Sequence, residues 1–225
     1  MELSAPNCAR CPFKPNERIC RTPDGKYPDN CPTVRKEPLV EKARAEYRRP
    51  ANAEFARQAS LQERDGYSHR ELGYARVRPA KPRIEETLEF IGKMGYRKIG
   101  LAFCLGLRNE AAVVERFFSA HGLDMVSVIC KVGRVPKEEL GLTDDDKIAV
   151  GTFETMCNPI LQAQVLNSEQ TELNILLGLC VGHDSLFLRY AEAPCTVLAV
   201  KDRVTGHNPL AALYTLDSYY RALKK

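Results

Sequence analysis

The sequence lacks the two features that direct a chain to or through a membrane. Its 225 residues contain no apolar run approaching the roughly 18 residues that a membrane-spanning helix needs. The N-terminus does not show the basic and then apolar segments of a signal peptide. Charge is nearly balanced, with 33 Lys and Arg against 29 Asp and Glu, so neither nucleic acid nor a membrane surface is expected as a partner. We expect a globular protein of the cytoplasm.

The sequence also lacks the glycine patterns that bind nucleotide phosphates. No GxGxxG follows an expected strand, and no P-loop is present. The nearest glycine context, "CLGLRNE" at 104–110, does not have the phosphate-binding spacing. A nucleotide is therefore not the default ligand.

Cysteine is the abundant residue type that needs an explanation. Nine cysteines are an odd number in a chain without a signal peptide, which argues against a secreted disulfide framework. They fall into two sets, with none between positions 31 and 104. The N-terminal set is Cys8, Cys11, Cys20 and Cys31, and the second set is Cys104, Cys130, Cys157, Cys180 and Cys195.

The N-terminal set lies in a segment that cannot form its own core. Residues 1–33 are rich in proline and turn residues and show neither helical nor strand periodicity. Metal binding would supply the missing folding energy, and Cys8 and Cys11 have the CxxC spacing that holds an ion or a cluster. We expect a metal-binding knuckle with Cys8, Cys11, Cys20 and Cys31 as its ligands.

The identity of that metal is open between iron and zinc. A zinc ion with four thiolates and an all-cysteine four-iron cluster both carry a charge of about −2, so the surrounding Lys and Arg residues suit either. The Cys11-Pro12 and Cys31-Pro32 steps resemble those of ferredoxin cluster ligands, and a second CxxC pair of a zinc ribbon is missing. We favour an iron–sulfur (4Fe-4S) cluster, with zinc as the alternative.

The rest of the chain changes from a helical to an alternating pattern. Residues 34–95 predict two helices separated at Pro50 and a third that stops at Gly95. In residues 96–225, apolar strands alternate with helices, which is typical of a parallel sheet covered on both faces. We expect a small Rossmann-like, doubly wound α/β domain of four strands in the order 2-1-3-4. The strands are expected at 97–104, 124–130, 172–180 and 195–201, and the helices at 109–122, 158–169, 184–193 and 208–223.

Three cysteines of the second set are expected at one edge of that sheet. Cys104 and Cys180 end the first and third strands, which the strand order makes neighbours. Cys157 precedes a helix that Asn158 caps, and the start of this helix faces the same edge. Their convergence predicts a second metal site, held by three cysteines and open at one coordination position, where the metal is an iron or a zinc.

Other side chains at this edge have a chemical and a structural interpretation. His183 and Asp184 follow the third strand and are the candidate catalytic proton donors. Cys130 and Cys195 we interpret as small buried core residues, and the same interpretation is the alternative for the three cysteines of the second site.

Several long strings in the chain point to a known family. "CNPILQAQVLN", "ELNILLGLCVGHDSLF" and "APCTVLAVKDRVTGHNPLAALY", with "CARCPF" and "CPT" near the N-terminus, resemble domain-of-unknown-function family 1847 of bacteria and archaea, over nearly the whole chain. Its description as metal-binding proteins implies a metal at the cysteine sites and no particular reaction.

A second likeness is local. "AFCLGLR" is similar to the first cysteine motif of the thiouracil desulfidase family, in which three cysteines hold a four-iron cluster whose fourth iron is open to substrate sulfur. The contexts of the second and third cysteines differ from that pattern. The likeness implies such a cluster only for Cys104, Cys157 and Cys180.

Two functions follow from these expectations. The first is an iron–sulfur protein of an anaerobe, which exchanges electrons or sulfur with a small molecule or a redox protein. The second is a zinc-stabilised binding or regulatory protein without catalytic activity, in which helices at 38–64 present a partner surface. The oligomeric state is left open.

Overall fold

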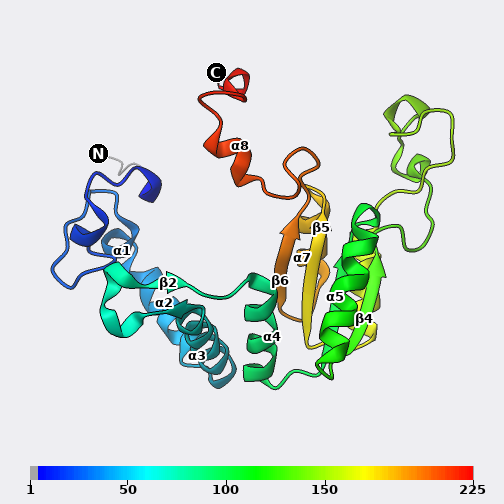
Figure 1. Ribbon diagram of the computed structural model, residues 1–225. Coiled ribbons are helices and arrows are strands. Elements are labelled where there is room, and N and C mark those ends of the chain that lie inside the picture. The colour runs from blue at the N-terminus through cyan, green and yellow to red at the C-terminus, as the bar shows by residue number, and fades with distance from the viewer. Residues whose placement is uncertain (1–4, 225) are drawn as a thin grey trace. The chain divides into compact units, whose positions relative to one another are not determined.

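The computed structural model of the protein describes residues 5–224. Its internal contacts divide the chain into two compact units, Met1–Asp65 and Gly66–Lys225. Figure 1 shows the first as coil and helices and the second as a sheet with helices. Within the described residues, no helix has the length and apolar character that crossing a membrane requires.

The first unit consists of a coiled N-terminal segment followed by three helices. These are α1 (Pro32–Arg35), α2 (Glu37–Tyr47) and α3 (Pro50–Asp65). Pro50 is the first residue of α3, which confirms the predicted separation of two helices there. The buried residues that the structure describes in this unit are two glutamines, Gln58 and Gln62. The described part of the unit therefore has no buried apolar side chain.

The second unit begins with a two-residue ladder and a helix that packs on the sheet. The ladder pairs β1 (Tyr67–Ser68) with β2 (Arg78–Pro79), and α4 (Arg83–Met94) follows. Gly95 ends α4 in the left-handed conformation, with φ 71°, which confirms the predicted stop. Because Ile91 of α4 is fully buried in the core of the sheet, this helix belongs to the second unit.

The sheet of the second unit has four parallel strands. Their spatial order is β4-β3-β5-β6, which confirms the predicted order 2-1-3-4. The strands are β3 (Lys98–Phe103), β4 (Asp124–Ile129), β5 (Leu173–Leu179) and β6 (Cys195–Val200).

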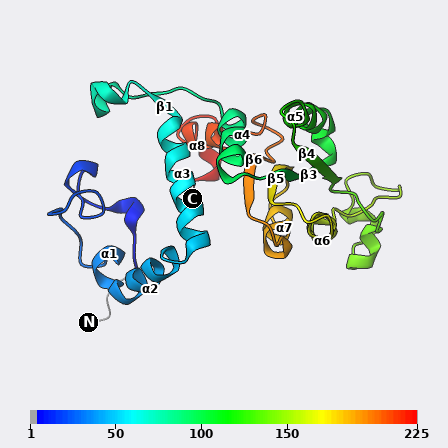
Figure 2. The ribbon, with the colours of Figure 1, turned by 90° about the horizontal axis from the view of Figure 1, so that it is seen from below.

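Helices cover the sheet on both faces. They are α5 (Arg108–Ala120), α6 (Pro159–Ser168) and α7 (His183–Tyr190). Figure 2 shows α5 on one side of the sheet and α6 and α7 on the other. A cluster that includes Phe118 of α5 fills the first face, and one that includes Leu166 and Phe187 fills the second. Burying each such side chain stabilises the fold by roughly 1.5–3 kcal/mol.

The edge strand β6 is covered in part by an arginine from α4. Arg83 Nε donates to the Val197 carbonyl at 2.6 Å, and Arg83 Nη2 donates to Thr196 Oγ1 at 2.9 Å. Arg83 therefore forms hydrogen bonds at the edge of β6 where the backbone of a further strand would otherwise pair.

The prediction of a helix over 208–223 is wrong. The structure has a short helix, α8 (Leu210–Tyr214), followed by turns and a 3-10 turn at Arg221–Leu223. Tyr214 and Tyr219 are largely exposed. A helix gains most of its stability by burying an apolar face, and no side chain of this segment is fully buried.

A long connection from β4 to α6 is irregular. It contains two 3-10 turns, Lys137–Leu140 and Asp144–Asp146. The Lys137–Glu154 ion pair, at 2.8 Å, joins its two ends, beside the bridge between Pro136 and Thr155. The connection thus returns to the carboxyl edge of the sheet just before Cys157.

Glu172 lies at the edge of the sheet where the parallel strands begin, and it allows a test of how that edge is held. Its carboxylate accepts hydrogen bonds from the Arg97 and Lys98 amides at 2.6 and 2.9 Å, and these bonds lower the pKa of Glu172. We expect Glu172→Gln to lower the free energy of unfolding at pH 7 by about 1 kcal/mol.

The pH dependence of this difference follows from the direction of the pKa shift. A carboxyl group with a lowered folded-state pKa stabilises the fold above its unfolded pKa and loses that contribution as pH falls through its folded pKa. The difference between wild type and Glu172→Gln, measured by urea unfolding with circular dichroism, should therefore shrink below about pH 4.5. Glu169→Gln, which removes an exposed ion pair with Lys98, is the control and should cost less. A difference independent of pH would contradict this role of Glu172.

Candidate functional site

The N-terminal segment folds around a small cavity that all four of its cysteines border. The cavity measures about 60 Å³, and Cys8, Cys11, Cys20 and Cys31 line it. Arg18 and Lys26 form an isolated parallel bridge, in which the Ile19 amide donates to the Lys26 carbonyl at 3.0 Å. The structure thus brings together the four residues that the sequence predicts as one ligand set.

Hydrogen bonds hold this segment, and a hydrophobic core does not contribute. Asn30 Nδ2 donates to the Ala5 carbonyl and Arg18 Nε to the Phe13 carbonyl, both at 2.8 Å. Between residues 5 and 31 none of the side chains is buried. Arg18 and Lys26 also border the cavity, so positive charge lies beside the four thiols.

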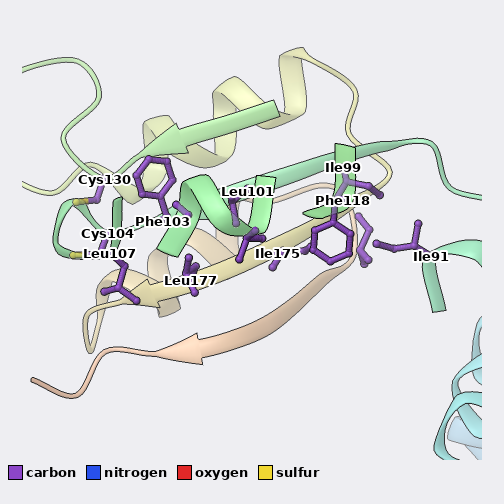
Figure 3. Close-up of a cluster of buried hydrophobic side chains, with 13 residues drawn as sticks. Ile91, Ile99, Leu101, Phe103, Cys104, Leu107, Phe118, Cys130, Ile175 and Leu177 are labelled. Atoms are coloured by element: carbon purple, nitrogen blue, oxygen red, sulfur yellow. The ribbon is translucent and has the colours of Figure 1, made fainter. Parts of the chain in front are cut away.

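The second site begins where two neighbouring strands end. Cys104 directly follows β3 and Cys130 directly follows β4, and the Cys130 amide donates to the Phe103 carbonyl at 2.9 Å. Figure 3 shows both cysteines at the same end of the buried cluster, opposite Ile91. Their thiols share a hydrogen bond, and the Leu105 amide donates to Cys130 Sγ at 3.2 Å. Cys104 and Cys130 are therefore fixed side by side at the carboxyl edge.

The loop before α6 adds a third thiol. The Asn158 amide donates to the Cys130 carbonyl at 2.8 Å, which holds Cys157 beside Cys130. Asn158 Oδ1 accepts from the Leu161 amide at 3.1 Å, which confirms the predicted cap. The Cys157 thiol interacts with Cys130 on one side and with His183 on the other. Cys104, Cys130, Cys157 and His183 form a row, which we call the sheet-edge cluster.

Interactions within the cluster lower the pKa of two of its thiols and raise the pKa of the third. The bond from Cys130 lowers the pKa of Cys104, helped by the Gly106 amide and by Lys201. It also lowers the pKa of Cys157, helped by His183. The interactions with Cys104 and Cys157, together with burial, raise the pKa of Cys130 itself. Of these three thiols, Cys130 is therefore the one that keeps its proton most firmly.

His183 is the first residue of α7, and its imidazole lies against Cys157. The interaction with the Cys157 thiolate raises the pKa of His183. Its Nδ1 atom is buried and finds no hydrogen-bond partner among the described residues.

Asp184, the other predicted proton donor, accepts from the Ser185 amide at 2.7 Å within the same turn. Its catalytic role stays a prediction.

Cys180 stands apart from the row. Arg203 Nη2 lies 3.1 Å from Cys180 Sγ, and burial, followed by the charge of Cys104, raises the pKa of the Cys180 thiol. The predicted set of Cys104, Cys157 and Cys180 thus occupies one edge of the sheet, but the hydrogen-bonded partner of the first two is Cys130.

Cys130 belongs to the core, at 3% exposure, which confirms the sequence interpretation. What that interpretation missed is that Cys130 also interacts with the Cys104 and Cys157 thiols. A signal was available, because the order 2-1-3-4 places the end of the second strand beside the end of the first. Cys195, at the opposite edge, is half-buried against the second core cluster, and its thiol donates to the Ala193 carbonyl at 3.3 Å.

Comparison with known proteins places these sites in a wider group. The family described as "Protein of unknown function (DUF1847)" matches residues 31–198, a range that contains the sheet-edge cluster. An uncharacterised protein of Methanocaldococcus jannaschii is 40% identical over 218 residues, which cover 97% of this chain and 96% of the relative.

The row of side chains predicts a specific effect of His183 on Cys157. We expect His183→Gln to raise the pKa of Cys157, because the thiolate loses the positive charge beside it but keeps the bond from Cys130. The pH profile of Cys157 alkylation by iodoacetamide, followed by peptide mass spectrometry, should move to higher pH. His121→Gln, at the exposed end of α5, should leave the profile unchanged. An unshifted profile in His183→Gln would show that the imidazole does not stabilise the thiolate.

Proposed function

The chain belongs to the DUF1847 family, whose description assigns no function, and from its own residues we propose that it is an iron–sulfur protein with a four-iron cluster on its N-terminal cysteines. The observation that carries the proposal is that Cys8, Cys11, Cys20 and Cys31 border one cavity. They do so in a segment where the structure describes no buried side chain. Ligand binding by four thiolates would supply the stability that such a segment cannot draw from apolar contacts.

The shape of the site supports a cluster better than a single zinc ion. In a zinc site each sulfur lies about 2.3 Å from one ion, so the sulfurs crowd within roughly 4 Å of one another. In a four-iron cluster each cysteine binds a different iron, so the thiols stand around a larger group. Four cysteines around a cavity fit the second arrangement.

The residues around the cavity would bind the cluster and balance its charge. Cys8, Cys11, Cys20 and Cys31 would be its ligands, and the positive side chains of Arg18 and Lys26 would offset the net charge of about −2. A bound cluster of this kind supplies one-electron transfer, to or from a redox protein or a small molecule. The second cluster predicted at Cys104, Cys157 and Cys180 stays a prediction.

Metal and sulfide analysis tests the proposal directly. Protein purified without oxygen should contain about four iron and four sulfide ions per chain at this site and absorb visible light. Cys11→Ser should lose most of this iron, whereas Cys195→Ser, at the far edge of the sheet, should keep it. A colourless, sulfide-free protein with about one zinc per chain would reject the cluster and favour the zinc-stabilised alternative.

Metal removal should affect the two units differently. Without its metal, the segment 5–31 has no core to keep it folded, while the sheet retains its buried clusters. We expect hydrogen exchange to become fast in residues 5–31 on metal removal and to stay slow in β3 and β5. Slow exchange of the N-terminal segment in metal-free protein would show that its fold does not need the metal.

A further inference from the structure

We propose that Cys157 and Cys130 form a redox-active dithiol that reduces a small anionic disulfide at the sheet edge. The inference goes beyond the iron–sulfur function and does not depend on what the N-terminal cysteines bind. It starts from the sheet-edge cluster, in which Cys104 and Cys130 are buried together and Cys157 packs against them, with His183 beside Cys157.

The backbone fixes the two reacting thiols as neighbours. Cys130 is anchored to the end of β3 through its amide, which donates to the Phe103 carbonyl, and its own carbonyl accepts from the Asn158 amide at 2.8 Å. Asn158 in turn caps α6, so the residue before it has a defined position. Cys157 packs against the buried cluster that contains Cys130, and it directly precedes Asn158, the hydrogen-bond partner of the Cys130 carbonyl.

Burial assigns a different role to each thiol. Cys157 is partly exposed, whereas Cys130 is 3% exposed. A substrate can therefore reach Cys157 first, and Cys130 meets only what is already attached to Cys157. Accessible and buried thiols in contact match the attacking and resolving positions of a thiol–disulfide exchange site.

Charges around the cluster favour an anionic substrate. Lys201 lies beside Cys104, and its Nζ atom is close to the backbone of Gly106. Arg203 contacts Cys180, and Lys131 acts on Cys157 while donating to the Thr155 carbonyl. Three cations around a thiol row would attract carboxylates of a small disulfide.

The exchange proceeds in two balanced steps. The Cys157 thiolate attacks one sulfur of a disulfide R–S–S–R, which forms a mixed disulfide with Cys157 and releases one thiolate, RS⁻. The Cys130 sulfur then attacks Cys157 Sγ, which forms the Cys130–Cys157 disulfide and releases the second RS⁻, while the Cys130 proton passes to a leaving thiolate. The protein dithiol gives up two electrons and the substrate disulfide gains them. Two molecules of a thiol reductant restore the dithiol and become a disulfide.

The test uses the full chain with its metal, purified without oxygen, and oxidised glutathione as the anionic probe. After alkylation of the remaining thiols in denaturant, non-reducing peptide mapping should find a Cys130–Cys157 disulfide and two released glutathiones per chain. Cys130→Ser should keep one glutathione on Cys157, because the resolving thiol is gone. Cys157→Ser should react at the sheet edge at least about 100-fold more slowly, and the control Cys195→Ser should behave as wild type.

Charge recognition is tested in the same assay. Neutral hydroxyethyl disulfide should react more slowly than oxidised glutathione at low salt, and Lys201→Gln should reduce that difference. Equal rates for the two probes would overturn the anionic substrate.

Three outcomes would overturn the dithiol itself. One is a wild-type peptide map without the Cys130–Cys157 disulfide, which decides the question even if a variant fails to fold. The second is release of both glutathiones by Cys130→Ser. The third is a loss of bound iron in Cys157→Ser, because it would identify the sheet edge as the second cluster site. Loss of iron in Cys11→Ser alone leaves the dithiol standing, so the two proposals can fail separately.

Discussion

All strands of the sheet run in the same direction, and this constraint decides where the reactive groups of the second unit lie. Parallel strands present their carboxyl ends at one edge, so Cys104 after β3 and Cys130 after β4 become neighbours although 26 positions separate them. The loop to α6 and the start of α7 reach the same edge and add Cys157 and His183. Parallel sheets are covered by helices on both faces, and here two apolar clusters pack against the strands. This packing fixes the positions of the strand ends.

The two units of the chain are stabilised by different means. The sheet gains its stability from two apolar clusters, around Phe118 on one face and Phe187 on the other. The described part of the segment before α1 is held by hydrogen bonds and the Lys26–Glu17 ion pair, and four thiols border its cavity. Cysteine consequently does different work in each unit. In the first, four cysteines border a cavity in a segment without buried side chains, and in the second, cysteines stand at the edge of a core built from apolar residues.

Sequence patterns predicted the elements well and the contacts between side chains less well. Periodicity and helix-terminating residues located Pro50, Gly95 and Asn158 correctly, and the alternation of strands and helices led to the right strand order. The strand order implies that Cys130 lies beside Cys104, but its position beside Cys157 depends on the irregular connection from β4 to α6, which has no sequence signature. The helix expected over 208–223 was wrong because its apolar residues, among them Tyr219, find no surface to cover. Periodicity shows that a face is apolar, but only the folded chain shows whether a partner for it exists.

The hydrogen bonds of Arg83 to β6 have a consequence for the behaviour of the protein at high concentration. An exposed edge strand is a template on which a strand of another molecule can assemble, and this is a common start of aggregation. Arg83 lies 114 positions before Val197 and occupies its carbonyl, so a foreign strand would have to displace a charged guanidinium before it could pair there. One side chain of α4 thus makes this end of the sheet a poor seed for intermolecular β-structure.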